Sequence, residues 1–446
     1  APPVWNMTDS AGRRTASAVA PPKDDVLSTI LDLRGKENGL ASTALPSATL
    51  DLLARIRSWA SRVLPAHVLA DLWQRGAPFP PAVFRSFVAE CGAGCLGLNL
   101  PPSHGGAGLD AVSAGAVSAE LFRADASFGT TLLVHWGLAT ESIAICGNED
   151  QKRRFLSDMI ALRRMACFCL TEPDSGSDAS GLKTTAELSP DGSYAIRGRK
   201  TWIGNATTAD LFVIWARNIS LPGNPVQGFV LSRSAQTDPA SIVTVKIENK
   251  TSLRIIQNAH ITFAGATCQK CDVLPPVGFG PSVGRVLAQS RLSVAWAPVG
   301  MCGHVLDLAA SFVRDREAFG APLASNQLIQ ERLVRMAAAV ATMRLLAGAT
   351  SEEVEAGRAG SAAAAMAKAH NTRVGREVVA MGRELLGGRG VLLEDLVAMK
   401  FCDMEAIYTY EGTYDMNVLV AGRAITGIAA IKSGEAYKRK LQLTSK

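Results

Sequence analysis

The stretch Phe168-Cys169-Leu170-Thr171-Glu172-Pro173-Asp174-Ser175-Gly176-Ser177-Asp178 marks the change from helical to strand-like patterning in this chain. It begins with apolar residues, as a buried strand does, and continues into a turn rich in hydroxyl groups and glycine. Such a turn can offer backbone N–H groups and hydroxyls to a phosphate or a polar heterocycle. An ordinary strand-to-loop turn has the same composition, so this stretch alone leaves both interpretations open.

The sequence before this stretch is helical in pattern. Apolar residues between positions 50 and 162 recur at steps of three and four, beginning with Leu52, Leu53, Ile56, Trp59 and Ala60. Residues 1–45 differ, because prolines there are scattered among Ser, Thr, Ala and Gly. We therefore predict a loose leader over residues 1–45 and an N-terminal helical domain over residues 46–165.

The middle of the chain is strand-like. Short apolar runs bounded by turn residues predict strands, and Asp191-Gly192 is a typical hairpin signal. The predicted strands are 166–170, 194–198, 211–215, 228–231, 242–247 and 261–263. These runs predict a central β domain over residues 166–278.

Helical periodicity returns after Gly280 and lasts almost to the end. Residues 333–346 and 362–386 are rich in Ala, Leu and Met, which is typical of buried bundle helices. We predict a C-terminal helical bundle over residues 279–446. The fold class is therefore α+β multidomain, and its order of helices, strands and helices is unusual enough to be informative.

Composition excludes several classes of protein. Of 446 residues, 48% are hydrophobic and 19% are charged, which fits a globular chain rather than a disordered one. The net charge of +6 is spread along the chain and aromatics make up only 6%, so we expect no nucleic-acid partner. No uninterrupted apolar stretch is long enough for a membrane span.

The cysteines do not predict a metal site. Nine cysteines at irregular spacing in a chain of this length do not form a disulfide scaffold. Cys268-Gln269-Lys270-Cys271 has metal-ligand spacing, but no second such pair and no His pair follows it. We interpret Cys268 and Cys271 as two small residues near a strand end, and we expect no metal.

Two further segments carry groups suited to a flat, charged ligand. In Lys200-Thr201-Trp202-Ile203-Gly204-Asn205 the indole can stack on a ring and the glycine lets a ligand edge approach the backbone. In Arg314-Asp315-Arg316-Glu317-Ala318-Phe319-Gly320, Arg316 can pair with a phosphate through two bonds. In isolation, a core Trp before a turn and a solvated helix end explain these segments equally well.

Glu411 is the candidate general base. It lies in Tyr408-Thr409-Tyr410-Glu411-Gly412-Thr413-Tyr414-Asp415, among three tyrosines and beside a glycine. Apolar surroundings remove hydration from a carboxylate, so its pKa rises towards neutrality. A raised pKa suits a base that must take a proton from a weakly acidic C–H. A glutamate at an exposed helix end is the alternative interpretation of Glu411 taken alone.

Taken together, these segments resemble the acyl-CoA dehydrogenase superfamily. Leu170-Thr171-Glu172-Pro173 with Gly176-Ser177-Asp178 is similar to its first signature. Glu384-Leu385-Leu386-Gly387-Gly388-Arg389-Gly390, followed by Tyr410-Glu411-Gly412-Thr413, is similar to its late motifs. The resemblance covers residues 50–431 and is nearest to plant-type short-chain acyl-CoA oxidases and the glutaryl-CoA dehydrogenase branch. It implies an N-terminal helical domain, a central β domain and a C-terminal four-helix bundle, assembled as a homotetramer.

The resemblance also implies the cofactor FAD, bound between the β domain and the bundle. Positions that match contacts to the flavin and its pyrophosphate are Phe168, Leu170, Thr171, Gly176, Ser177, Trp202, Ile203 and Gly204. Positions that match contacts across a subunit interface or near the late motifs are Arg316, Phe319, Gln327, Glu384, Gly387, Gly388, Thr413 and Asp415. Positions that match contacts to the acyl-CoA substrate are Ser177, Arg291 and Gly412.

The implied reaction is α,β-desaturation of an acyl-CoA thioester to a trans-2-enoyl-CoA. Glu411 removes the α proton and the β hydrogen leaves as a hydride to flavin N5. The backbone N–H of Glu411 and a ribityl hydroxyl of FAD stabilise the developing enolate oxygen.

Two departures from the family pattern refine this expectation. Glutaryl-specific members carry an arginine where this chain has Gly129, so we expect an uncharged, short straight acyl chain. Most dehydrogenases carry a threonine at the position where this chain has Gly204. The short-chain oxidases also have a glycine there. Gly204 removes a hydroxyl beside flavin N5 and would open space for dioxygen. We therefore expect an oxidase that passes electrons to O₂, with a dehydrogenase that uses an electron-transfer flavoprotein as the alternative.

The C-terminal residues bear on the compartment of the protein. The final Ser445-Lys446 is one leucine short of a peroxisomal address, which favours a peroxisomal-type organelle, with the mitochondrial matrix as the alternative.

One branch of the superfamily binds DNA without catalysis through a clustered basic surface. This chain keeps Glu411 and shows no such cluster, which disfavours that branch.

Overall fold

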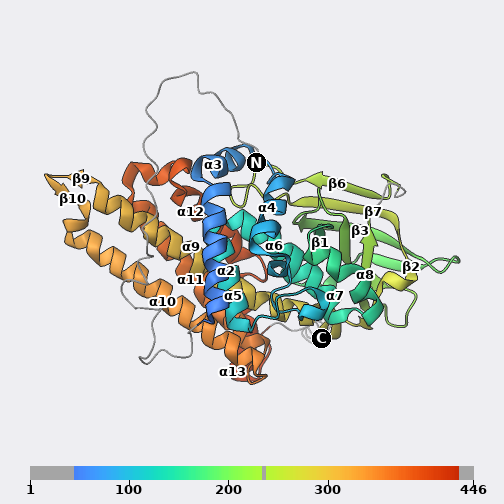
Figure 1. The fold of residues 1–446 in the computed structure, drawn as a ribbon. Helices are drawn as coiled ribbons and strands as arrows, with labels where there is room; N and C mark the ends of the chain where they lie inside the picture. The colour runs from blue at the N-terminus through green and yellow to red at the C-terminus, as the bar shows by residue number, and fades with distance from the viewer. Residues whose placement is uncertain (1–44, 234–237, 431–446) are drawn as a thin grey trace, which may run out of the picture.

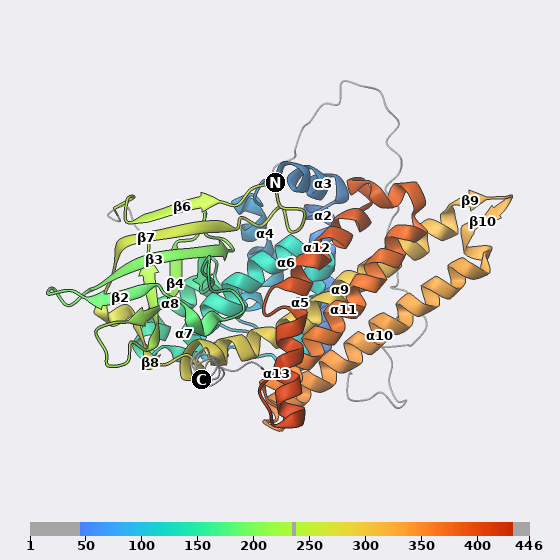
Figure 2. The ribbon, with the colours of Figure 1, turned by 180° about the vertical axis from the view of Figure 1, so that it is seen from behind.

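The computed structural model of the chain describes residues 45–233 and 238–430 (Figure 1). The predicted leader lies almost wholly outside these residues, as do the last sixteen positions with Ser445 and Lys446. The sheet occupies one end of the molecule and the long C-terminal helices extend towards the other (Figures 1 and 2). This arrangement confirms the predicted fold class of N-terminal helices, central sheet and C-terminal helices.

The N-terminal part is helical, as predicted. Its first helix buries the stripe Leu52, Ile56 and Trp59 against the core, and side-chain caps begin three of the later ones. Asp110 caps α5, Asp125 caps α6, and α8 begins with a reciprocal capping box. The helices are α2 (Ser47–Val63), α3 (Ala66–Arg75), α4 (Pro81–Cys91), α5 (Ala111–Ala124), α6 (Ala126–Leu133), a π-helical turn (Val134–Thr140), α7 (Glu141–Cys146) and α8 (Glu149–Ile160).

The central sheet is mixed, and its strands run in the order β6-β7-β3-β2-β4-β5-β8, with β1 paired parallel to β4. Each of the six predicted runs coincides with a strand, and two of them, 166–170 and 242–247, extend one residue beyond it. Asp191-Gly192 lies in the hairpin between β2 and β3, which pair antiparallel. The strands are β1 (Ala166–Cys169), β2 (Thr185–Leu188), β3 (Tyr194–Ile203), β4 (Leu211–Asn218), β5 (Val226–Ser232), β6 (Ile242–Lys246), β7 (Ala259–Cys268) and β8 (Val273–Val277).

The C-terminal part is a bundle of long helices around α9 and α11. Together with its preceding turn, α9 is long and apolar enough to cross a membrane by length and composition, as is α10. The most apolar window of α9 is 78% buried inside the protein, as expected of a core helix, and that of α10 is 39% buried. The elements are α9 (Arg285–Asp315), a hairpin of β9 (Glu317–Ala318) and β10 (Ala321–Pro322), α10 (Gln327–Glu355), α11 (Ser361–Leu385), α12 (Val397–Thr409) and α13 (Tyr414–Thr426).

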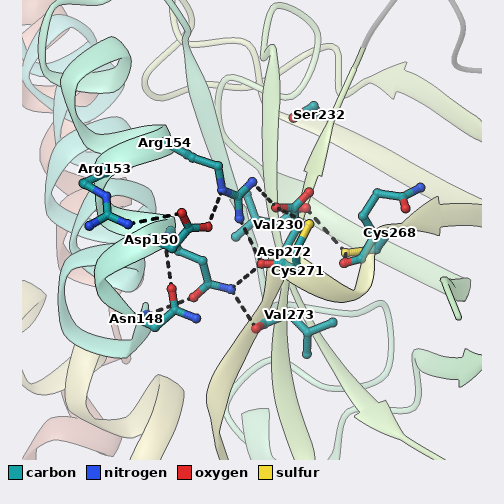
Figure 3. A network of polar contacts seen from close by, with 12 residues as sticks. Asn148, Asp150, Arg153, Arg154, Val230, Ser232, Cys268, Cys271, Asp272 and Val273 are labelled. Atoms are coloured by element: carbon teal, nitrogen blue, oxygen red, sulfur yellow. Dashed lines mark hydrogen bonds and ion pairs between the residues drawn. The ribbon is translucent and has the colours of Figure 1, made fainter.

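Helix α8 is fixed to the connection between β7 and β8 by polar contacts (Figure 3). Arg154 pairs with Asp272 at 2.6 Å. The thiol of Cys268 donates to the Val230 carbonyl, whereas that of exposed Cys271 faces Asp272. Cys268 ends β7, in line with our interpretation of the pair. Within residues 45–233 and 238–430, no group of three His, Cys, Asp or Glu side chains could hold a metal.

Candidate active site

Glu411 lies in the tight turn between α12 and α13, in a strained backbone conformation. Its φ of 56° is in the left-handed region, and that of Gly412 is 84°. The amide of Asn417 donates to the carbonyls of Gly412 at 2.7 Å and Thr413 at 3.1 Å, which holds the turn. Left-handed non-glycine residues cost free energy and cluster at functional sites. The backbone strain therefore supports the functional interpretation of Glu411.

The carboxylate of Glu411 is held by a hydrogen bond from α9. The Ser290 hydroxyl donates to Oε1 at 2.5 Å. Desolvation by the surrounding protein raises the pKa of Glu411, and the Ser290 bond and the charges of Arg291 and Lys368 oppose that rise. The rise in pKa is the property that we predicted from the local sequence.

The three tyrosines around Glu411 have different contacts. The Tyr410 hydroxyl lies 3.4 Å from Thr130 Oγ1 on α6, and burial raises the pKa of Tyr410. The rings of Tyr408 and Tyr414 stack on each other with centroids 5.6 Å apart. Tyr410 thus links the turn of Glu411 to the N-terminal helices, next to Gly129.

Two positive side chains complete the surroundings of Glu411. Lys368 on α11 is fully buried and donates to the carbonyls of Tyr408 at 2.9 Å and Gly412 at 2.7 Å. Arg291 on α9 acts electrostatically on both Glu411 and Lys368. Its Nε is buried with no hydrogen-bond partner among the described residues. Arg291 was predicted as a substrate contact, and its position beside the base is compatible with that role.

The candidate flavin segments from β1 and β3 are brought together by backbone and side-chain bonds. Lys200 Nζ donates to the Leu170 carbonyl at 2.9 Å and to Glu172 Oε1 at 2.9 Å. The Thr201 N–H donates to the Thr171 carbonyl at 2.9 Å. Two of the predicted segments, joined by contacts between residues 28 or 30 positions apart in sequence, therefore form one surface.

This surface presents an exposed indole and an accessible glycine in a hydroxyl-rich turn. Trp202 is 57% exposed at a φ of 60°, which projects an indole from the strand end. Gly176 and Ser177 are exposed in the hydroxyl-rich turn. No described atom lies within 4 Å of where a Cβ on Gly176 would be, so a ligand can approach this backbone. By contrast, Phe168, Leu170 and Ile203 are buried and support the surface from within.

The remaining cofactor candidates fall into two places. Thr413 caps α13 by accepting from the Met416 N–H, and Asp415 follows in its first turn, so both lie beside Glu411. The others lie around the β9–β10 hairpin and the end of α11, at the opposite end of the bundle from the sheet (Figure 2). All of this second group are exposed: Arg316, Phe319, Gln327, Glu384, Gly387 and Gly388.

The second group is too far from Glu411 to share a ligand atom within one chain. Lys368 contacts the turn of Glu411, and α11 continues from there to Leu385. At 1.5 Å per residue these two positions are roughly 25 Å apart along the helix. The hairpin residue Phe319 is left-handed, with a φ of 55°, and fully exposed. We therefore distinguish a base group around Glu411 from a hairpin group around Phe319.

We predicted the substrate from Gly129 and the electron acceptor from Gly204. Both glycines pack closely against neighbouring side chains. A Cβ on Gly129 would lie 2.8 Å from the ring of Phe122. A Cβ on Gly204 would lie 3.1 Å from side-chain atoms of both Ile256 and Val134. The structure therefore shows no empty space in the direction of a Gly204 side chain, which removes the physical reason for our oxygen-access argument.

Sequence reasoning missed two residues of the site, Ser290 and Lys368. Ser290 is 121 positions from Glu411, and Lys368 is 44 positions from Gly412. Neither has a local pattern that distinguishes it from an ordinary helix residue. Only the packing of α9 and α11 against the turn shows their proximity to Glu411.

Known proteins are similar to this chain in sequence and in fold. Profiles of the acyl-CoA dehydrogenase N-terminal, middle and C-terminal domains match residues 48–163, 167–266 and 278–426. A Bos taurus protein named "Short-chain specific acyl-CoA dehydrogenase, mitochondrial" is 30% identical over 73% of this chain and 79% of its own length.

Two solved structures resemble the chain as a whole. A glutaryl-CoA dehydrogenase from Mycobacterium smegmatis in complex with FADH2 has a TM-score of 0.80 and 28% identity, over 87% of this chain and 97% of its own. Butyryl-CoA dehydrogenase from Megasphaera elsdenii has a TM-score of 0.79 and 25% identity, over 88% of this chain and all of its own. The chain therefore belongs to the acyl-CoA dehydrogenase family, FAD-dependent oxidoreductases that act on the CH–CH bond of acyl-CoA thioesters.

Proposed function

We propose that the protein desaturates a short, uncharged fatty acyl-CoA between its α and β carbons, with Glu411 as the general base and an electron-transfer flavoprotein as the acceptor. The observation that supports this proposal most strongly is the strained, hydrogen-bonded Glu411 with its raised pKa. A carboxylate whose proton affinity is raised by desolvation is suited to take the α proton of a thioester.

In this proposal the chain's own residues handle the proton and the thioester. Glu411 takes the α proton, and Ser290 holds its carboxylate in one orientation. The backbone N–H of Glu411 stabilises the negative charge that develops on the thioester oxygen. Bound FAD supplies the redox chemistry by accepting the β hydride. The Leu170–Ser177 turn and Trp202 form the surface that would hold the cofactor beside Glu411.

The uncharged substrate is inferred from Gly129. An arginine at this position would have to displace the ring of Phe122, which is buried in the core. A distal carboxylate that reached this position would meet no cation from Gly129. The relatives named for short-chain and butyryl substrates favour a short chain.

The acceptor is the point at which we depart from our first expectation. We expected O₂ because Gly204 lacks a hydroxyl. Its missing side chain leaves no void, because Val134 and Ile256 fill that space. The three relatives described above carry the name dehydrogenase. Both observations favour a flavoprotein acceptor, and rapid reaction with O₂ would restore the oxidase.

We infer that a complete cofactor site needs a second copy of the chain. The base group and the hairpin group both match FAD-contacting positions, yet they lie at opposite ends of α11. A homo-oligomer, a homotetramer by the family pattern, could bring the hairpin group of one copy to the base group of another.

The mitochondrial matrix is our preferred compartment. The Bos taurus relative is named as mitochondrial, whereas the suggested peroxisomal signal rests on Ser445 and Lys446, outside the described residues. Microscopy of the tagged full-length protein against markers for both organelles decides between them.

Anaerobic reduction by a panel of acyl-CoAs tests the proposed reaction. Butyryl-CoA should bleach the bound flavin much faster than glutaryl-CoA. The reduced enzyme should reoxidise rapidly with an electron-transfer flavoprotein and slowly in air. Failure of every acyl-CoA to bleach the flavin would refute the reaction. Fast glutaryl-CoA reduction with release of carbon dioxide would refute the argument from Gly129.

A further inference from the structure

A buried lysine on α11 contacts the turn of Glu411, in addition to Ser290 on α9. Lys368 lies in the first half of α11 and is fully enclosed by protein. Its ammonium donates to the carbonyl of Tyr408, before Glu411, and to that of Gly412, after it. The one side chain thus bridges both ends of the left-handed turn that carries Glu411.

This lysine is also electrostatically coupled to the base. Burial lowers the pKa of Lys368 to about 7, and the charges of Glu411 and Arg291 act on it in opposite directions. Glu411 in turn faces Ser290, Arg291 and Lys368, and its charge also acts on Tyr410. Arginine stays protonated at any pH of interest, so Lys368 and Glu411 are the two coupled groups here whose protonation can change.

We propose that Lys368 is a positioning residue for the desaturation, which holds the backbone of the Glu411 turn through two carbonyls and keeps the Glu411 carboxylate ionised by its charge. This inference rests on the proposed function, because it concerns the base of that reaction. It assigns two separable effects. The hydrogen bonds set how well Glu411 is placed, and the positive charge sets the pH at which Glu411 becomes a base.

Two substitutions separate these effects. Lys368→Met removes the donors and the charge but keeps the length of the side chain. Lys368→Gln removes the charge and keeps N–H donors. Because an opposite charge nearby stabilises a carboxylate, loss of the Lys368 charge should raise the pKa of Glu411 by on the order of one unit.

The measurement is the rate constant of flavin reduction by saturating butyryl-CoA, in anaerobic stopped flow from pH 5 to 10. In both variants the rising limb of the pH profile of this rate constant should shift by about one unit to higher pH. The maximal rate constant should fall further in the Met variant than in the Gln variant. Lys400→Met is the matched control, because Lys400 is another buried lysine of the bundle that donates to a carbonyl, that of Arg123. Lys400→Met should lower thermal stability without shifting the rising limb of the pH profile.

The outcomes are distinguishable from those of the proposed function. If wild type is not reduced by butyryl-CoA, the reaction itself is wrong. If wild type is reduced and both Lys368 variants keep its pH limb, the electrostatic role of Lys368 is wrong, and if both also keep its maximal rate constant, the positioning role is wrong. If neither variant retains flavin, the pH dependence of flavin reduction in wild type tests the inference instead. Coupled loss of protons from Glu411 and Lys368 predicts two steps in the pH profile, a rise as Glu411 ionises and a second change in rate constant as Lys368 loses its charge, and a single step contradicts the inference.

Discussion

At the scale of single residues, the site depends on contacts that hold one carboxylate. Glu411 is in a conformation that costs on the order of 1–3 kcal/mol for a residue with a side chain. The bonds from Asn417 and Lys368 to neighbouring carbonyls offset that cost. Ser290 then fixes the carboxylate itself. The placement of the base therefore depends on α9, α11 and α13 together.

The Ser290 hydrogen bond should control the proton affinity of the base. Because this bond stabilises the ionised form, Ser290→Ala should raise the pKa of Glu411. A hydrogen bond to a charged group contributes about 1.5–3 kcal/mol, so the rising limb of flavin reduction should move upward by about one pH unit or more. The pH dependence of single-turnover reduction by butyryl-CoA measures this shift.

Ser351→Ala is the control for Ser290→Ala. Ser351 is a buried serine on α10 that accepts from Trp296, in a different part of the bundle. Its loss should lower stability but leave the pH limb in place. An unchanged limb in Ser290→Ala, with flavin retained, would contradict the role that we assign to this hydroxyl.

At the scale of elements, a buried ion pair joins the turn after β1 to β3. Lys200 is fully buried, and Glu172 also accepts from the backbone N–H groups of Lys183 and Thr184. Burial raises the pKa of Glu172, but the Lys200 charge and these hydrogen bonds more than offset that effect, so the pKa lies below its usual value. The pair thereby fixes the hydroxyl-rich turn against β3, the strand that carries Trp202.

Loss of one member of this pair should be costly. Lys200→Met leaves a buried carboxylate without its cation, which typically destabilises a protein by about 3–5 kcal/mol. We expect a lower midpoint of unfolding in urea and faster loss of FAD. The double variant Lys200→Met with Glu172→Gln, which removes both charges, should recover part of the loss. A Lys200→Met protein as stable as wild type would show that the pair does not hold the turn.

The sequence predicted elements best where they carry strong periodic patterns. The buried runs of β4 and β5 are continuous and apolar, so they were readily identified. Two strands of the central sheet were not predicted. β2 has only one buried residue, and β8 contains two prolines, which normally argue against a strand. Both exist because other strands pair with them: β2 with its hairpin neighbour β3 and with β4, and β8 with β5.

The site was predictable only in part, for a similar reason. Glu411, Trp202 and the Leu170–Ser177 turn lie in recognisable local motifs, and the structure places them in plausible positions. Ser290 and Lys368 act only through tertiary packing. The inference from Gly204 was wrong about free space, because a single sequence does not reveal that Val134 and Ile256 fill the gap.

At the scale of the whole molecule, a buried acidic residue joins the three parts of the chain. Asp403 on α12 accepts from the backbone of Leu253, in the middle part, at 2.6 Å and from Trp73 on α3 at 3.3 Å. Desolvation, with repulsion from Asp125, raises the pKa of Asp403 to about 7. The protonated form of Asp403 therefore suits the folded state better than the ionised form.

This shift predicts how stability depends on pH. In the unfolded chain Asp403 has its ordinary pKa of 3.8. Its stabilising contribution is therefore complete below pH 3.8 and is lost as pH rises through about 7. At about 1.4 kcal/mol per unit, the upper bound is about 4 kcal/mol. The difference in free energy of unfolding between wild type and Asp403→Asn, measured from pH 4 to 8, should fall as pH rises. A difference that stays constant over this range would contradict the assignment.

The division of cofactor residues between two ends of the bundle predicts complementation between subunits. Arg316→Ala should weaken FAD retention by about 1.5–3 kcal/mol, as expected for a lost charge-assisted hydrogen bond. Glu411→Gln should abolish flavin reduction. If copies share sites, unfolding and refolding the two variants together should recover activity that neither has alone, because some sites then carry both native residues. No recovery in oligomers shown to be mixed would contradict a shared site.

The most direct test of the account is anaerobic stopped-flow reduction of the bound flavin by butyryl-CoA in wild type and Glu411→Gln. The amide has nearly the shape of the carboxylate but cannot accept the α proton. We predict that Glu411→Gln retains FAD and binds butyryl-CoA, while its flavin stays oxidised on the timescale at which wild type is fully bleached. Bleaching of the Gln variant at a rate close to that of wild type would contradict the assignment of Glu411 as the base.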